Sequence, residues 1–132
     1  MKPRDFDAWH AYLHDRLKTP HGWGANDCVK FGWGAAKALT GDDLQKRFGR
    51  DWTSHKGAVR VLRSVGGIEA GMDTLLPRTP CAHAHRGDLG LVETPVYGPT
   101  LVVIEGTHVC APGPRGLVRV QRSELKAAWS LG

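Results

Sequence analysis

The spacing of the apolar residues changes along the chain, and this change limits the folds that it can adopt. In the first part, Phe6, Trp9, Leu13 and Leu17 recur at helical spacing, which predicts an amphipathic helix over residues 5–17. Further helices are predicted from Asn26 or Asp27 to Thr40-Gly41, within residues 42–51, from the capping Ser54 to Gly66-Gly67, and over residues 68–76.

After a connector that contains Pro77 and Pro80, the pattern becomes one of short apolar blocks divided by Gly and Pro. Helices followed by an antiparallel sheet are typical of an α+β fold. No internal repeat or long linker divides the chain, so we expect a single domain over residues 1–132. The predicted strands are residues 89–92, 101–104, 108–110 and 117–120, with one helical turn in 123–127 and a final strand or packed tail at 128–130.

The composition is that of an ordinary globular chain with a modest excess of positive charge. It has 132 residues, 41% of them hydrophobic and 23% charged, and a formal net charge of +5. The charge favours acidic partners, but the basic residues are scattered, so nucleic-acid binding is not predicted. The apolar block 101–104 is too short to span a bilayer, and residues 1–5 do not resemble a signal peptide. We therefore expect synthesis in a reducing cytoplasm.

Cys28 follows a loop rich in Gly and Trp and stands at the start of a predicted helix. A helix N-terminus stabilises a thiolate, so this is a suitable place for the nucleophile of a papain-type cysteine peptidase. The chain has three cysteines, so they cannot all pair within one molecule. Cys28 and Cys110 are expected to be free thiols that pack in the core.

Four segments carry a resemblance to a known family. Residues 27–31 read Asp-Cys-Val-Lys-Phe, where NlpC/P60 domains typically read Asp-Cys-Ser-Gly-Phe. Their Gly-Asp-Leu strand start is matched at residues 87–89, and their His-Val-Gly-Ile-Tyr-Ile-Gly strand at residues 100–106. Their Ile-His-Ala-Pro strand is matched by Val-Cys-Ala-Pro at residues 109–112. The chain thus resembles the NlpC/P60 superfamily of papain-like cysteine peptidases, which implies that fold.

Other motifs follow one another in an order that is similar to one branch of that superfamily. They are Trp-Gly-x-x-Asp-Cys at residues 23–28, Ala-Leu-Thr-Gly-Asp-Asp at 38–43, Gly-Gly at 66–67, Gly-Leu-Val at 116–118 and Ala-Trp at 128–129. The branch is a group of uncharacterised NlpC/P60-like proteins that are encoded beside phage tail genes. The resemblance implies a component of a phage tail.

The resemblance also implies which positions correspond to a catalytic triad. Cys28 matches the nucleophile, Thr100 the general-base histidine, and Cys110 the group that orients the base. Threonine cannot accept a proton near neutral pH, and cysteine orients an imidazole poorly, so the predicted triad is degenerate. An alternative base is His108, because side chains two apart in a strand share a face and His108 would point the same way as Cys110.

Three further residues are expected near the mouth of the predicted cleft. Trp23 and Trp52 lie in loops and are candidates for binding a partner, together with Asp27. His21 precedes Cys28 in the same loop, where it is expected to pack against its neighbours.

The histidines give only weak indications of a metal. Cys81, His83 and His85 alternate, so an extended segment would place them on one side as ligands for zinc or iron. They lie in a connector that lacks an evident fourth ligand, and a plain loop is preferred. His10 and His14 share a helix face but have no further ligand nearby. We expect no metal and no cofactor.

These observations predict an α+β, NlpC/P60-like domain that acts at the phage tail tip or in tail assembly. It would bind other tail proteins, with possible contact to peptidoglycan, and it would be made in the host cytoplasm and incorporated into the virion tail. One alternative is an active cysteine endopeptidase or amidase that cleaves peptidoglycan with Cys28 and His108. Another is a free-standing binding or inhibitory module.

Overall fold

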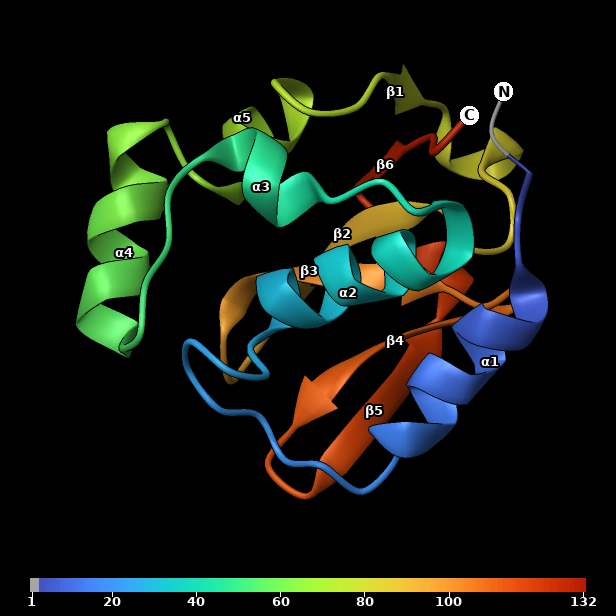
Figure 1. The fold of residues 1–132 in the computed structure, drawn as a ribbon, viewed down its shortest axis with the longest axis horizontal. Helices are drawn as coiled ribbons and strands as arrows, with labels where there is room; N and C mark the ends of the chain where they lie inside the picture. The colour runs from blue at the N-terminus through green and yellow to red at the C-terminus, as the bar shows by residue number, and fades with distance from the viewer. Residues whose placement is uncertain (1–2) are drawn as a thin grey trace.

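The computed structural model describes residues 3–132, in which five α-helices lie against one face and one end of an antiparallel sheet (Figure 1). Four of the helices begin after an Asp or Ser whose side chain accepts a hydrogen bond from a backbone N–H three residues on. The helices are α1 (Phe6–Asp15), α2 (Cys28–Thr40), α3 (Leu44–Phe48), α4 (His55–Ser64) and α5 (Ile68–Asp73).

The sheet has six strands in the order β1-β6-β2-β3-β4-β5, and every pair is antiparallel. This confirms the predicted α+β class. Short 3₁₀ turns lie at Cys81–His83 and Arg122–Glu124. The strands are β1 (Arg78–Thr79), β2 (Leu89–Thr94), β3 (Gly98–Ile104), β4 (His108–Gly113), β5 (Gly116–Gln121) and β6 (Ala127–Trp129).

Two local predictions differ from the structure. The first helix ends at Asp15, before Leu17, whose carbonyl oxygen accepts a hydrogen bond from the N–H of Leu117 near the start of β5. The predicted connector contains β1, in which Arg78 is paired with Trp129 of β6. A two-residue edge strand has no alternating apolar pattern, so it leaves no signal in the sequence.

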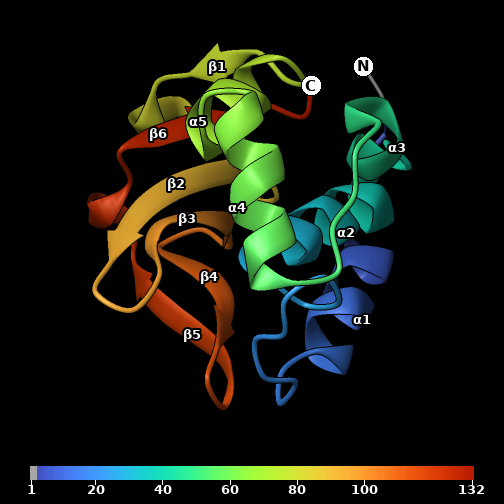
Figure 2. The same ribbon diagram turned by 90° about the vertical axis from the view of Figure 1, so that its left-hand side faces the viewer.

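Helix α2 is the central helix and packs across β3 (Figure 2). A Cβ atom at Gly32 would lie only 2.9 Å from a side-chain methyl carbon of Leu101, so the glycine allows helix and strand to approach closely. Most of the α2 side chains are buried, including Phe31 and Trp33. The N-terminus of α2 is thereby held over the first half of β3. Within residues 3–132, no helix has both the length and the apolar character that a bilayer span requires.

Asp88 ties the two ends of the described chain to the start of β2. Its side chain is fully buried and accepts hydrogen bonds from Arg4 at 2.8 Å, from the N–H of His85 at 2.7 Å and from the N–H of Leu131 at 3.1 Å. Arg4 also donates to the carbonyl oxygen of Gly132. A buried carboxylate is stable only when its lone pairs are satisfied in this way.

Replacing Asp88 should therefore destabilise the whole fold. Asp88→Ala would leave the Arg4 guanidinium and two backbone N–H groups without their acceptor, which typically costs about 3–5 kcal/mol. The free energy of unfolding in urea measures the loss. The control is Asp15→Ala, which removes an exposed partner of Arg16 and should change stability by about 0.5 kcal/mol or less. Equal losses in both variants would contradict this account of Asp88.

Candidate functional site: a cleft at the N-terminus of helix α2

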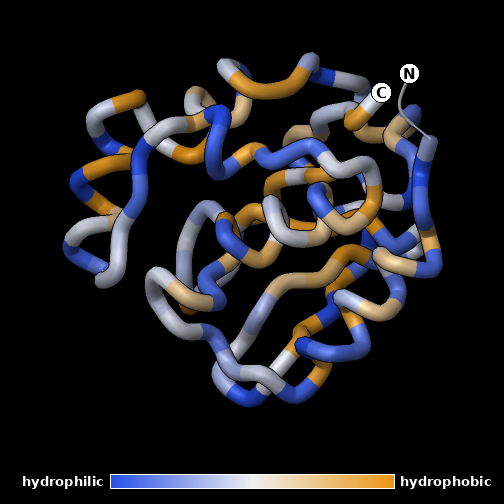
Figure 3. Tube along the Cα trace, in the orientation of Figure 1, coloured by the Kyte–Doolittle hydropathy of each residue, from blue (hydrophilic) through white to orange (hydrophobic). Residues whose placement is uncertain are grey.

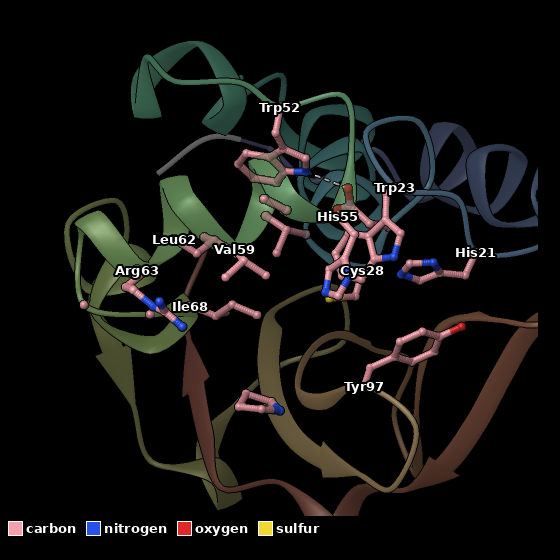
Figure 4. Close-up of a pocket in the computed structure, with 16 residues that line it drawn as sticks. His21, Trp23, Cys28, Trp52, His55, Val59, Leu62, Arg63, Ile68 and Tyr97 are labelled. Atoms are coloured by element: carbon pink, nitrogen blue, oxygen red, sulfur yellow. Dashed lines mark hydrogen bonds between the residues drawn. The ribbon is translucent and has the colours of Figure 1, made fainter.

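A cavity of about 600 Å³ separates α4 from the N-terminus of α2 and the turn between β2 and β3 (Figure 4). Helix α4 stands apart from the other helices and supplies one wall (Figures 1 and 2). Ala58 of this helix is buried, whereas Val59 and Leu62 border the cavity and are only partly covered by other side chains. The cavity is lined by His21, Trp23, Asp27, Cys28, Val29, Trp52, His55, Val59, Leu62, Arg63, Ile68, Tyr97 and Pro99, together with Ala58, Gly66 and Gly67.

The carboxylate of Asp27 fixes the geometry at the end of α2. One oxygen accepts a hydrogen bond from the N–H of Lys30 at 2.9 Å, which caps the helix. The other accepts from the N–H of Gly24 at 2.9 Å and from the indole N–H of Trp52 at 2.8 Å. Asp27 is 1% exposed, so these three donors satisfy a buried charge. The loop before α2 and the segment before α4 are thus joined to the helix at one point.

Cys28 follows directly, but its thiol is not in the state that a nucleophile needs. The residue is 6% exposed, and burial raises the pKa of the thiol to about 12. The N–H of Leu101 and those of the first helical turn oppose this shift in part, while the charge of Asp27 adds to it. Desolvation therefore outweighs the stabilisation of a thiolate that a helix N-terminus was expected to provide.

Thr100 is not brought into contact with the cleft. Leu101 lies beside Cys28, and adjacent strand residues point to opposite faces of the sheet, so Thr100 points away. Its hydroxyl donates to the carbonyl oxygen of Gly98 at 3.0 Å and lies 3.3 Å from that of Thr94. It lines a second cavity, on the other face of the sheet. At this level of β3 the residue that borders the cleft is Pro99.

Cys110 and His108 lie farther along β4. Cys110 is paired with Val103 and is buried. Burial raises the pKa of its thiol, and the neighbouring carboxylate of Glu105 raises it further. His108 is exposed, and its Nδ1 atom lies 3.1 Å from the hydroxyl of Thr107.

The register places His108 four residues along the sheet from Leu101, which is about 13 Å at about 3.3 Å per residue. His108 also does not line the cavity that Cys28 lines. The proposed dyad of Cys28 with His108 is therefore not formed in this structure.

A group of stacked rings that was not predicted from the sequence lies at one end of the cleft. Tyr97 stacks on His21 with ring centroids 4.4 Å apart, His21 meets Trp23 edge-on at 4.6 Å, and Trp23 stacks on His55 at 4.5 Å. His21 does pack within its loop, as expected, but it also borders the cavity. His55 follows the capping Ser54, and in a helix residues 55, 58 and 62 share one face, so this spacing places His55 on the same side as Ala58 and Leu62.

The partly buried position of His21 disfavours a positive charge on its ring. Burial and the neighbouring His55 lower the pKa of His21, and Asp27 opposes the shift in part. The folded protein therefore holds this ring neutral where an unfolded chain would protonate it. Since the unfolded state then binds more protons, this group makes stability rise with pH through the range just below the usual histidine pKa.

The segment with the candidate metal ligands is not extended. Cys81–His83 form a 3₁₀ turn, and the side chain of Arg122 donates to the carbonyl oxygens of Cys81 and Ala84. Cys81, His83 and His85 therefore do not have the alternating arrangement that an extended segment would give them. In the part of the chain that the structure describes, no three His, Cys, Asp or Glu side chains are grouped in a way that suits a metal ion.

Comparison with known structures defines the class of the fold. The structure is similar to the NlpC/P60 domain of the peptidoglycan hydrolase SagA, with a TM-score of 0.57 and 18% sequence identity, over 96% of this chain and 98% of that one. The helices and the antiparallel sheet thus form an NlpC/P60-type, papain-like fold. The chain belongs to the family described as "Domain of unknown function (DUF6950)", whose model matches residues 3–131. No curated protein matches the sequence.

The state of the thiol can be tested by alkylation. In a Cys81→Ser, Cys110→Ala variant only Cys28 can react, and its rate should keep rising with pH beyond pH 10, because its pKa is raised to about 12. The rate of iodoacetamide modification, followed by mass spectrometry, measures this. Modification of the same variant in 6 M urea is the control and should titrate near the free value of about 8.5. A plateau below pH 8 in the folded protein would contradict the assignment of an inert thiol.

Proposed function

We propose that this domain is a binding module built on the NlpC/P60 fold, without peptidase activity, and that it is a component of a phage tail which binds other tail proteins. The observation that carries the proposal is the closed environment of Cys28, combined with an open cleft next to it. The cleft is large enough to receive a ligand, while the cysteine beside it is buried.

The chemistry of the thiol supports a role without catalysis. With a pKa of about 12, a fraction on the order of 10⁻⁵ of the thiol would be ionised at pH 7. A cysteine peptidase needs a thiolate, a base within hydrogen-bond reach and a group that orients the base. Neither Thr100 nor His108 lines the cleft, so neither is placed to act as that base.

The assignment to a phage tail is supported by sequence motifs. The order of the motifs, from the Trp-Gly-x-x-Asp-Cys loop at residues 23–28 to the Ala-Trp pair at 128–129, resembles proteins encoded beside tail genes. Within a phage tail, the domain would bind other tail proteins at the tail tip or during assembly. A partner that fills the cleft would cover Val59, which is 39% exposed.

A second candidate function is that of a thiol hydrolase acting on peptidoglycan, the substrate named for the SagA domain. One observation favours it. His21 and His55 line the same cavity as Cys28, although His21 lies in a loop and His55 in α4, whereas the catalytic histidine of NlpC/P60 domains is expected on a strand. Either imidazole would then have to take the proton of a thiol that a conformational change had exposed. The two candidate functions differ in whether Cys28 is required: the hydrolase needs its thiol, and the binding module does not.

The proposal can be tested in the phage or prophage that encodes the chain. Mass spectrometry of purified tails should detect the protein. Cys28→Ala phage should form plaques within about twofold of wild type, because the change removes only a small buried side chain. Asp27→Ala, which leaves three donors unpaired, should reduce the amount in tails.

Absence of the protein from purified tails would refute the tail assignment. Cys28→Ala particles that assemble normally but fail to deliver DNA through the cell wall would refute the inactive role and favour the hydrolase.

A further inference from the structure

The cleft beside α4 has one wall that is both apolar and basic. Val59 and Leu62 face the cavity, with Ile68 at the end of the same wall (Figure 4). Lys56, Arg60 and Arg63 are exposed and follow one another at i, i+4 and i+7, so they form a stripe along the adjacent flank of the helix. We call this stripe the basic rim.

The charges of the basic rim are unmatched within the described chain. None of the ion pairs among residues 3–132 includes Lys56, Arg60 or Arg63, and α4 itself contains no acidic residue. The single carboxylate that lines the cavity, Asp27, is buried and already accepts three hydrogen bonds. An occupant that brings negative charge would thus meet three free cations and no competing anion.

The aromatic side chains at one end of the cleft indicate which classes of ligand are disfavoured there. Proteins that bind single-stranded nucleic acid stack bases on free aromatic faces. Here Trp23 is stacked on His55 and His21 on Tyr97, so these faces are already in contact with one another. A lipid surface is also disfavoured, because the apolar side chains of the wall point into a concave cavity.

We propose that the cleft binds an acidic, aliphatic segment of a partner protein, whose apolar side chains enter the cavity while its carboxylates meet the basic rim of α4. This inference deepens the proposed binding function and rests on it, but it does not depend on the assignment to a phage tail. The volume of about 600 Å³ is within the range of pockets that hold one short segment or drug-sized ligand. Arg63, which both lines the cavity and belongs to the basic rim, would set the position of one carboxylate.

The test uses two labelled peptides of matched length, acetyl-ELELELE-amide and acetyl-KLKLKLK-amide, with the full-length protein. Fluorescence anisotropy at low and high salt should show binding of the Glu peptide that weakens as salt rises, and weaker binding of the Lys peptide. The triple variant K56E, R60E, R63E should bind the Glu peptide about tenfold less tightly, as expected for the loss of three exposed charge pairs. It should also gain affinity for the Lys peptide.

The matched control is K18E, R115E, K126E, which makes the same change in net charge at exposed positions outside the cleft. It should leave affinity within about twofold, and circular dichroism should show that both variants fold. If both triple variants lost the same affinity for the Glu peptide, the loss would be explained by net charge alone, and the proposal would be overturned. Failure of the Glu peptide to bind at millimolar concentration would also overturn it, as would tighter binding of oligothymidylate or anionic vesicles that depends on the same three residues.

These outcomes are separable from those of the tail assignment. A protein found in tails whose cleft ignores the Glu peptide keeps its tail role and loses this inference. A protein that binds the peptide but is absent from tails retains the inference and loses the tail role.

Discussion

The candidate site depends on the buried carboxylate of Asp27. It caps α2, holds the loop at Gly24 and accepts a hydrogen bond from the indole N–H of Trp52, which lies 25 residues farther along the chain. Trp52 lies two residues before Ser54, the cap of α4, so the same carboxylate helps to fix the position at which the far wall of the cleft begins. A buried charge of this kind is retained only when all of its partners are in place, which makes the cleft a rigid feature on its α2 side.

This arrangement satisfies the helix terminus with Asp27 and leaves Cys28 in an apolar environment. In an active thiol enzyme, the helix N-terminus and a nearby imidazole favour the thiolate. Here the thiol of Cys28 lies between α2 and β3, and the residue that caps the helix, Asp27, is itself negatively charged. Burial and this charge raise the pKa of the thiol. Cys28 thus stands at the N-terminus of a helix, but the surroundings of its thiol disfavour ionisation. What remains usable is the cleft itself, with the ring stack at one end and Arg63 of the basic rim at the other (Figure 4). Along α4, hydrophobic and hydrophilic residues alternate, as expected for a helix with one apolar and one charged side (Figure 3).

Much of the fold could be predicted from local patterns, because caps and periodicity act over a few residues. Asp27 and Ser54 were expected to begin helices, and the main strands fall where the apolar blocks are. The placement of Thr100 could not be predicted from spacing, since a shift of one residue turns a strand side chain to the other face. His55 was missed because its partners, Trp23 and the cavity, are remote in sequence. The role of Cys28 turns on its burial, a property of the tertiary packing.

We propose that the cleft binds a partner without cleaving it. Cleavage can be measured as the release of soluble peptides from purified peptidoglycan by the wild-type protein and by Cys28→Ala at neutral pH, with an active NlpC/P60 hydrolase as a positive control. The account predicts that both proteins release no more than the buffer alone. Release by the wild-type protein that is lost in Cys28→Ala would contradict it, and would show that the buried thiol becomes exposed and ionised during a catalytic cycle.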